Sequence, residues 1–431
     1  MGSATDFYST LPKDTKKSGP TSLADHFVHV CFQIILWLYV FITRLALRFS
    51  PQKPFPENDP LEILLTGTFF SDNWIISLLR PLALSTRCGR IRFVSTTPVP
   101  DIENVEPIYP PKRLIKLIGR TPARLATFIW IAFRTRPHII GGLHLLINGL
   151  VAISLAKLIG VKALYSCCGG PTECEGGGYS SENHLFCKLS GPDQIIENRL
   201  LEAISLADVV ITRGKRAIHF FQERGVKTQF HVVPGGMDGI KFSPSEMPSI
   251  NDLIIIGNLV PRKRIDLFLQ IVSKVHAIRP DIRTVVLGDG PLLQTLESQV
   301  KKLALQDIVH FAGYQNNVAE WLQQSKIFIL TSEAEGLSQA MIQAMLCGLP
   351  AVVSHVGEAE ELVVNSVNGF LVRDLNVDVF VKAIIKLLDD HAMLSNFSKA
   401  ARKSAERCDV HYLARKWDEI LNELVESSSL K

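Results

Sequence analysis

The feature that most constrains the fold of this chain is a regular alternation of short apolar runs with amphipathic segments after Asp252. Each apolar run ends at a loop, and the loop leads into a stretch with apolar residues at helical spacing. Apolar strands that alternate with helices are typical of a parallel sheet covered on both faces. The predicted strands are 253–256, 284–287, 308–311, 327–330 and 351–354, and the predicted helices are 266–278, 292–303, 318–324, 337–346 and 359–363.

A looser form of the same pattern occupies the first half of the chain. The predicted strands there are 61–65, 91–94, 138–141, 163–166, 209–212 and 231–233, and the predicted helices are 110–136 and 145–159. A turn-rich segment at 234–238 separates the halves. We therefore expect an α/β chain with two Rossmann-like, doubly wound parallel-sheet domains that face each other across a cleft. Their expected limits are 55–235 and 236–405, with a C-terminal helix in 406–431.

The first 50 residues differ in composition from the rest. Residues 1–24 are polar and are expected to be disordered. Residues 25–50 form an apolar segment whose centre, Cys31–Ile42, is interrupted only by Gln33. It is close to the length that spans a bilayer and lacks the small-residue cleavage site of a secretory signal. Three interpretations stay open: a membrane-embedded or interfacial anchor, a helix packed on the folded body, and a segment without function.

Charge is distributed unevenly, although the net charge is only +4. No Asp or Glu occurs between Pro107 and Thr172, and a basic face of this kind attracts phosphates or anionic lipid head groups. The cations of this window are Lys112, Arg113, Lys116, Arg120, Arg124, Arg134, Arg136, Lys157 and Lys162. The ordinary alternative is a solvated face whose carboxylate partners lie elsewhere in the fold.

The basic window also has apolar and aromatic residues at helical spacing, which suits a membrane surface or, as the equal alternative, ordinary helix packing. We therefore expect a cytoplasmic protein that associates with a membrane through residues 27–49 and the basic region 112–136. Nucleic acid is not expected as a partner, because the basic stretch is apolar-rich rather than interleaved with aromatic residues on a sheet.

Eight cysteines occur without a CxxC pair, which fits a reduced cytosolic protein without a disulfide framework. Cys167, Cys168 and Cys174 lie close to a glycine-rich loop. A metal site there is the less favoured interpretation, and small residues that line a crowded loop are the favoured one. We expect no metal and no cofactor.

The stretch 328–350 carries most of the chemical information. An apolar run ends at Thr331, the carboxylate of Glu335 follows, and a helical pattern begins near Leu337. Unpaired N–H groups and the positive end of the helix dipole make such a helix start a natural site for a phosphate. Glu335 lies at the mouth of this site, where it can accept a hydrogen bond from a hydroxyl of the phosphate-bearing molecule.

Two more loops are expected at the same edge, because ligands of open parallel sheets bind at the carboxyl ends of the strands. The first is a glycine turn followed by the consecutive cations Arg262, Lys263 and Arg264, which can neutralise a diphosphate. The second contains Gly288 and Gly290, which let backbone approach a ligand closely. Neither loop has the GxGxxG spacing, so a hydride-transfer enzyme is disfavoured.

The order of these motifs resembles the family-four retaining glycosyltransferases (glycosyl transferases group 1), which have the GT-B fold. The order is the cationic loop, Gly288–Pro291, Phe311–Tyr314, the acidic helix start, Gly348–Pro350 and Asn368-Gly369. The resemblance is strong over residues 231–372, looser over 136–230 and absent from 1–60. It implies a retaining transfer of sugar from a nucleotide-sugar donor without a metal, with the donor mainly on the C-terminal domain and the acceptor mainly on the N-terminal one.

By this resemblance, Lys263 holds the donor diphosphate and Glu335 contacts hydroxyls of the donor sugar. By the same resemblance, Gly336, Leu337 and Ser338 form the start of the helix, and their backbone faces the diphosphate. The other expected donor-binding residues are Gly257, Asn258, Arg262, Arg264, Gly288, Gly290 and Gln343.

Three positions depart from the family pattern. Gln343 replaces the second glutamate of the E-x7-E motif, and its amide can still bond to a ribose hydroxyl, although without charge. Asn258 replaces an arginine, whose charge Arg262 or Arg264 could supply. The histidine that often ends the strand predicted at 163–166 is missing, which leaves the identity of the donor sugar open.

The glycine-rich segment 169–178 is expected to border the acceptor pocket. It begins with Gly169 and Gly170, and its carboxylates Glu173 and Glu175 either orient acceptor hydroxyls or are ordinary polar loop residues. The expected acceptor is a glycan or a lipid-linked molecule. A two-step retaining mechanism needs two facing carboxylates, and Glu335 has no evident partner in the sequence, so the departing phosphate itself is expected to take the proton of the acceptor.

The resulting hypothesis is a membrane-associated retaining glycosyltransferase of polysaccharide, glycolipid or glycoconjugate biosynthesis. A soluble sugar acceptor is the nearest alternative. The departures at Asn258 and Gln343 leave open a catalytically weak nucleotide-sugar-binding partner subunit. A nucleotide-sugar epimerase on the same architecture is the third alternative.

Overall fold

The computed structural model describes residues 23–429 except 52, 57–58, 70, 180, 182–185, 187–188 and 247. The disorder expected for 1–24 concerns residues outside this part of the chain, except that residues 23 and 24 belong to a helix. The described chain forms two compact units, one of residues 23–236 with 410–429 and one of residues 237–409. Each unit is built on a parallel sheet, which confirms the expected α/β class with two Rossmann-like domains.

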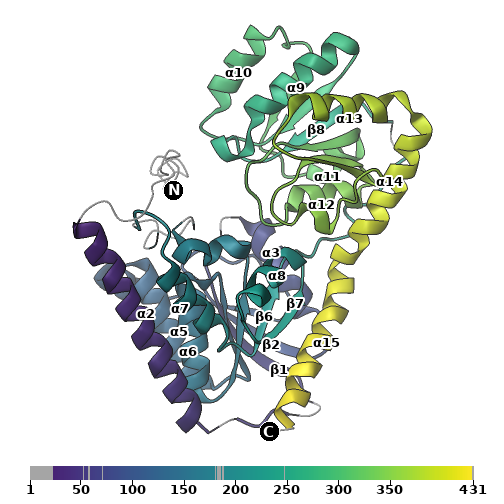
Figure 1. Cartoon of the computed structure of the whole chain (residues 1–431). Helices are drawn as coiled ribbons and strands as arrows, with labels where there is room; N and C mark the ends of the chain where they lie inside the picture. The colour runs from purple at the N-terminus through teal and green to yellow at the C-terminus, as the bar shows by residue number, and fades with distance from the viewer. Residues whose placement is uncertain are drawn as a thin grey trace. The chain divides into compact units, whose positions relative to one another are not determined.

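A seven-stranded sheet with the order β3-β2-β1-β4-β5-β6-β7 lies at the centre of the first unit (Figure 1). Its strands are β1 (Leu61–Thr66), β2 (Cys88–Val94), β3 (Val105–Ile108), β4 (Ile139–Leu143), β5 (Lys162–Ser166), β6 (Val209–Thr212) and β7 (Gln229–Val232). Strands β4, β5 and β6 are buried along their whole length, as expected when helices cover both faces of a sheet. Pro107 is tolerated in β3 because this strand lies at the edge of the sheet.

Helices form a layer on each face of this sheet. One layer contains α5 (Arg120–Thr135), α6 (Leu150–Ile159), α7 (Gln194–Ile204) and α8 (Lys215–Glu223). The other contains α3 (Asp72–Ala83) and α15 (Val410–Ser429). The sequence alone treats the last helix as a separate terminal segment. The structure returns it to the first unit, where Trp417 and Leu421 complete the apolar core around α3.

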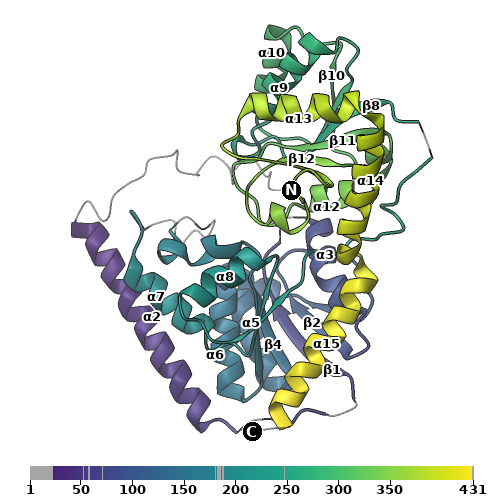
Figure 2. The same cartoon turned by 45° about the vertical axis from the view of Figure 1, so that its right-hand side comes forward.

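Helix α2 (Leu23–Phe49) contacts α6 and α7 on the side away from the sheet, as both views show (Figures 1 and 2). This finding confirms the expected N-terminal apolar helix. Within the described residues, α2 is the one helix that is long and apolar enough to cross a membrane, and only 17% of its most apolar 18-residue stretch is buried.

The second unit has a six-stranded parallel sheet with the order β10-β9-β8-β11-β12-β13 (Figure 2). Its strands are β8 (Asn251–Ile256), β9 (Thr284–Leu287), β10 (Val309–Gly313), β11 (Ser325–Leu330), β12 (Ala351–Ser354) and β13 (Gly369–Val372). Its helices are α9 (Ile265–Ile278), α10 (Leu293–Lys302), α11 (Val318–Gln323), α12 (Gln339–Leu346), α13 (Val377–Asp389) and α14 (His391–Ala405). Because β8 and β11 are neighbours, the loops at their carboxyl ends meet.

Three expected helices differ from the structure. The segment 110–136 divides into α4 (Lys112–Ile118) and α5, because Gly119 between them has a φ of 87°. The segment 145–159 becomes a regular α-helix only at Leu150, since Leu146 has non-helical backbone angles. The helix expected at 359–363 is a short 3₁₀ turn, Ala359–Glu361.

Candidate functional site

Two loops of the second unit, which follow β8 and β11, are joined by hydrogen bonds. The hydroxyl of Thr331, at the end of β11, lies 3.0 Å from the carbonyl oxygens of both Lys263 and Arg264. The backbone N–H of Glu333 donates to the carbonyl oxygen of Arg262 at 2.9 Å. These bonds fix the cationic loop against the acidic loop, so the position of each charged side chain depends on both.

Lys263 and Glu335 form an ion pair at this junction. The Nζ atom of Lys263 lies 2.5 Å from Oε1 of Glu335, and the two side chains are 16% and 11% exposed. The structure therefore brings together the two residues expected to hold the diphosphate and the donor sugar. An ammonium group has three N–H donors, so this bond leaves Lys263 able to donate to a ligand.

Helix α12 begins at Gln339, and Gly336 and Leu337 lie in the loop between Glu335 and the N-cap residue Ser338. Ser338 caps the helix, with its side chain accepting from the N–H of Met341 at 3.4 Å. The N–H groups of Gly336 and Leu337 make no hydrogen bond with any residue that the structure describes. Unpaired N–H groups and the helix dipole favour an anion here. The ammonium group of Lys263 is close by, because it bonds to the side chain of Glu335.

The loop after β9 packs closely against the cationic loop. Gly288 has a φ of 134°, and a Cβ at this position would overlap the carbonyl oxygen of Gly257. A Cβ at Gly290 would likewise meet the backbone of Leu259. The sequence-based expectation was that these glycines let backbone approach a ligand. In the structure they let one loop approach another.

The two arginines beside Lys263 differ in their partners. The guanidinium of Arg264 binds Asp266 at 3.0 Å and Glu333 at 2.7 Å. These hydrogen bonds, above all the one to Asp266, raise the pKa of Arg264 above its ordinary value. Two carboxylates therefore balance the charge of Arg264. Arg262 is exposed and donates to the carbonyl oxygen of Ala334 at 3.3 Å. Of the two, Arg262 is therefore the better source of the positive charge missing at Asn258.

Gln343 and Asn258 lie in different surroundings. Gln343 is 9% exposed, and its Nε2 atom lies 3.7 Å from Sδ of Met237, a weak partner for an amide donor. Asn258 is exposed. The burial of Gln343 limits its reach toward a ribose hydroxyl in this conformation.

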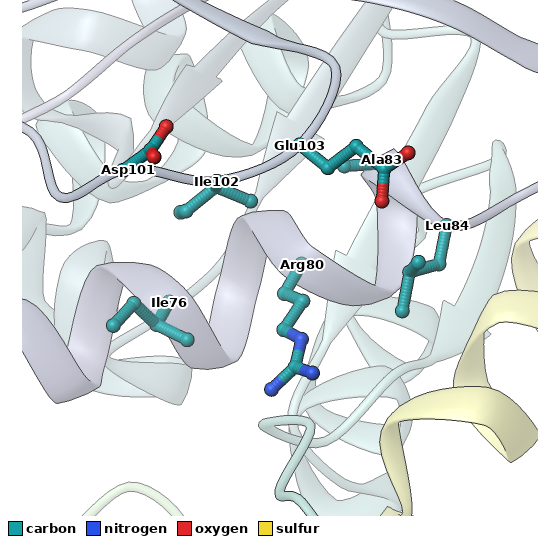
Figure 3. Close-up of a pocket in the computed structure, with 7 residues that line it drawn as sticks. All are labelled: Ile76, Arg80, Ala83, Leu84, Asp101, Ile102 and Glu103. Atoms are coloured by element: carbon teal, nitrogen blue, oxygen red, sulfur yellow. The ribbon is translucent and has the colours of Figure 1, made fainter.

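A hollow of about 330 Å³ opens at the carboxyl ends of β11, β12 and β13. Its lining includes Glu333, which belongs to the acidic loop, and Ser354, whose hydroxyl donates to the carbonyl oxygen of Ser332 at 2.7 Å. Neither Lys263 nor Glu335 lines this hollow. A second hollow, of about 320 Å³, lies in the first unit between α3 and the loop before β3, beside Arg80, Asp101 and Glu103 (Figure 3). None of the predicted site residues lines it.

On the acceptor side, Glu173 holds several strand ends together. This carboxylate is 5% exposed. It accepts from the N–H groups of Leu145 at 2.6 Å and Gly169 at 2.5 Å and from the hydroxyl of Tyr165 at 2.8 Å, and Nδ1 of His144 lies 3.1 Å away. Both oxygens of Glu173 are thus engaged by groups of the first unit in this structure.

The other acceptor-side residues lie around this carboxylate. Gly169 is one of its donors, Gly170 begins a short 3₁₀ turn with a φ of 71°, and Glu175 is exposed. Of the two carboxylates of this segment, Glu173 is buried and Glu175 faces solvent.

Sequence reasoning did not identify His144, which contacts Glu173, or Trp74 and Arg213, which interact with His144. The ring of His144 stacks on Trp74 with centroids 5.7 Å apart. Arg213 donates to the hydroxyl of Ser166 at 2.8 Å and to the sulfur of Cys168 at 3.4 Å. His144 and Arg213 each follow the last residue of a strand directly, so the rule that ligands bind at carboxyl ends of strands could have found them.

We expect the stabilising contribution of His144 to depend on pH. Burial opposes its charged form, but Cys168 and Glu173 outweigh burial and the repulsion of Arg213, and the pKa of His144 is raised to about 9. The contribution is therefore complete below pH 6.5 and is lost as the pH rises through 9. His144→Gln should lower the free energy of unfolding by about 1–3 kcal/mol at pH 6 and by much less at pH 9.5. Thermal denaturation at both pH values measures this, and equal losses would contradict it.

Seven cysteines are free, and Cys187 lies outside the described residues. Within the part of the chain that the structure describes, no three His, Cys, Asp or Glu side chains are grouped so that they could hold a metal ion. Burial raises the pKa values of Cys167 and Cys174, which keeps them protonated. Cys174 is a small core residue of the glycine-rich segment, and Cys167 is one just before it.

Comparison with known proteins matches this site to one family. The family model described as glycosyl transferases group 1 matches residues 240–404, which include both loops and α12. N-acetyl-alpha-D-glucosaminyl L-malate synthase of Bacillus anthracis is 33% identical over 152 residues, which are 35% of this chain and 40% of that protein. UDP-Gal:alpha-D-GlcNAc-diphosphoundecaprenol alpha-1,3-galactosyltransferase of Escherichia coli is 28% identical over 186 residues, 40% and 48% of the two chains.

The fold likeness extends over both units. HepE of Anabaena, whose crystal structure is a complex with UDP, has a TM-score of 0.65 at 18% identity and covers 84% of this chain and 100% of its own. The sequence matches to the first three curated relatives span only 20% to 48% of their lengths. Residues 240–404, which hold the Lys263–Glu335 pair, therefore match the glycosyl transferases group 1 family, and both units share the fold of HepE.

Proposed function

We propose that this protein is a retaining glycosyltransferase that moves a sugar from a nucleotide sugar to a glycan or lipid-linked acceptor at a membrane surface. The observation that carries the proposal is the Lys263–Glu335 pair beside the unpaired N–H groups of Gly336 and Leu337. A diphosphate bound there meets an ammonium and two amide donors. Such groups stabilise the negative charge that develops on the leaving group, which is commonly the largest electrostatic contribution to catalysis.

The proposed reaction takes place in one step on one face of the sugar. The acceptor oxygen forms a bond to the anomeric carbon while the bond from that carbon to the diphosphate oxygen breaks. The proton of the acceptor hydroxyl passes to the departing phosphate, so the products are the glycoside and a nucleoside diphosphate. Lys263 and Arg262 offset the charge of the diphosphate, so we propose that the transfer needs no metal. Glu335 orients the donor sugar through the carboxylate oxygen that Lys263 does not occupy.

The relatives support a choice of substrates. HepE was crystallised with UDP, and the Escherichia coli relative is named for UDP-Gal and a diphosphoundecaprenol-linked sugar. We propose a UDP-sugar donor and a lipid-linked acceptor for this chain. The basic region on α4 and α5 and the exposed apolar helix α2 support the membrane location. The free cysteines support a reducing compartment such as the cytoplasm.

The experiment measures UDP release by the purified protein from UDP-glucose, UDP-galactose and UDP-N-acetylglucosamine, with and without polyprenyl-diphosphate-linked sugars. We expect acceptor-dependent release, a product with the anomeric configuration of the donor by NMR, and the same rate in EDTA. Glu335→Gln should reduce the rate at least 100-fold, because an orienting contact at the reacting sugar is lost. Glu360→Gln, an exposed carboxylate paired with His355, is the matched control and should keep the wild-type rate.

An inverted product, a strict metal requirement or full activity of Glu335→Gln would contradict the proposal. Conversion of one UDP-sugar to its epimer without an acceptor would indicate an isomerase. UDP binding without turnover of any donor would indicate a partner subunit.

A further inference from the structure

Helix α2 has two faces of opposite character, and the polar one is turned toward the protein. Nδ1 of His29 lies 2.7 Å from a carboxylate oxygen of Asp193, and Gln33 donates to the same oxygen at 2.9 Å. The hydroxyl of Tyr39 donates to the carbonyl oxygen of Leu150 at 2.8 Å. The polar groups in the middle of an otherwise apolar helix thus have partners on α6 and α7.

The face turned away from the domain is apolar from Phe27 to Leu45. Phe27, Ile34, Leu38, Phe41 and Leu45 recur at three-, four- or seven-residue spacing and are 42–69% exposed. This spacing places them on one stripe. No Asp, Glu, Lys or Arg occurs from residue 26 to residue 43. From Phe27 to Leu45 the stripe is about 27 Å long, a larger apolar surface than soluble proteins leave to water.

Cations accompany the apolar stripe on the same side of the first unit. Helix α5 packs against α6, as α2 does, and all three share one core. The exposed cations of α4, α5 and the residue after them are Lys112, Arg113, Lys116, Arg120, Arg134 and Arg136. None of them has a carboxylate partner within the described chain, whereas Lys157 and Lys162 of the same basic window pair with Asp208. The alternative of a basic face neutralised within the fold therefore holds only for part of the window.

We propose that α2 lies flat in the interface of an anionic lipid bilayer, with its apolar stripe in the acyl region, and does not span the membrane. A helix that spans would have to leave α6 and α7 and take His29, Gln33 and Thr43 into hydrocarbon, where unpartnered polar groups are costly. Anionic head groups complement the exposed cations of α4 and α5. A second copy of this chain would instead add a second set of the same cations, which favours lipid as the occupant.

This orientation connects the membrane to the acceptor side of the site. Asp193, which holds His29 and Gln33, also donates its backbone N–H to the carbonyl oxygen of Gly176 at 2.9 Å. The ring of Phe32 packs 4.8 Å from that of Phe186. The first turns of α2 therefore fix the end of the glycine-rich segment beside the lipid surface. This consequence rests on the proposed function, because it places a lipid-linked acceptor next to the segment that begins at Gly169.

Trp37 gives the most direct test, since it lies near the middle of α2. A spanning helix would place Trp37 near the centre of the bilayer, whereas a helix in the interface keeps it near the head groups. We expect lipids brominated close to the head group to quench its fluorescence more than lipids brominated near the chain end. The signal is the difference between the full-length wild type and Trp37→Phe on phosphatidylcholine vesicles with 30% phosphatidylglycerol. Stronger quenching by the deep bromines would overturn the proposal.

Vesicle flotation tests the apolar stripe with a matched pair of substitutions. Ile42 on α2 is 60% exposed, and Ile278 at the end of α9 in the other unit is 59% exposed. Ile42→Asp should lower the partition onto anionic vesicles at least tenfold without changing the melting temperature, and Ile278→Asp should leave it unchanged. Equal effects of the two variants, or a dimer in solution that Ile42→Asp dissociates, would refute lipid as the occupant.

The same assay separates this inference from the proposed function. Glu335→Gln should float as the wild type does even though it does not transfer sugar. If the wild type transfers sugar to a soluble acceptor but does not float, the orientation of α2 is wrong and the transfer chemistry stands.

Discussion

Lys263→Ala is expected to lower kcat/KM for sugar transfer by about 10³-fold, because it removes the charged donor closest to the leaving diphosphate. Most of the loss should be in kcat, since the charge on the leaving group is larger in the transition state than in the bound donor. The measurement is steady-state UDP release with the donor that the wild type uses. Lys263→Arg keeps the charge but replaces a compact ammonium group by a planar guanidinium group, so we expect it to recover only part of the rate.

The ion pair allows catalysis and stability to be separated. Lys263→Ala leaves the carboxylate of Glu335, 11% exposed, without its partner, so we expect the free energy of unfolding to fall by about 1–3 kcal/mol. The double variant Lys263→Ala/Glu335→Ala should regain stability, because no unpaired charge is left, and stay inactive. Lys274→Ala is the control, since its partner Asp378 is a surface carboxylate of the same unit. Activity of Lys263→Ala within tenfold of the wild type would remove the basis for a diphosphate at this position.

The sequence predicted the strands of both sheets better than the helices. The limits expected for 209–212, 284–287 and 351–354 agree with β6, β9 and β12. Each is a short apolar run that ends at a polar residue or a glycine loop, and burial on both faces of a parallel sheet accounts for such runs. The meeting of the cationic and acidic loops followed from the same pattern, since residues at the carboxyl ends of neighbouring strands meet wherever the order of strands places them.

Several helices were missed although their sequences contain capping signals. The side chains of Ser71, Asp193, Asn376 and Asp390 each accept a hydrogen bond from the first turn of α3, α7, α13 or α14. Side chains of these types favour helix starts, but the same types also favour turns, so they do not decide between the two. Pro81 inside α3 further weakened the helical pattern.

The acceptor side could not be predicted from local sequence. A carboxylate in a glycine-rich segment is usually exposed, yet Glu173 is buried because His144, Tyr165 and Leu145 converge on it from two other strand ends. That convergence depends on the neighbouring positions of β4 and β5 in the sheet, which a single sequence does not give. The role of Arg213 depends in the same way on β6.

Gly357 is a residue whose close contact with the backbone of the donor-side site is visible only in the structure. It lies in the turn after β12 and has a φ of 56°. A Cβ there would overlap the carbonyl oxygens of Glu335 and Gly336. The neighbouring Glu358 donates its N–H to the carbonyl oxygen of Gly336 at 2.9 Å. The turn after β12 therefore supports the backbone that holds Glu335 and the start of α12.

Gly357→Ala should lower kcat/KM for sugar transfer at least 100-fold, because the overlap moves the backbone of Glu335 and a displacement of about 1 Å can cost that much. Gly225→Ala is the matched control: its φ is 78°, but no atom lies within 4 Å of the added Cβ. Both variants should lose about 1–2 kcal/mol of stability from the left-handed backbone angle, and only Gly357→Ala should lose transfer. Thermal denaturation beside the UDP-release assay separates the two effects. Equal activity of the two variants would mean that the loop of Glu335 adapts to the added methyl group, and the site would then not depend on the close contact at this turn.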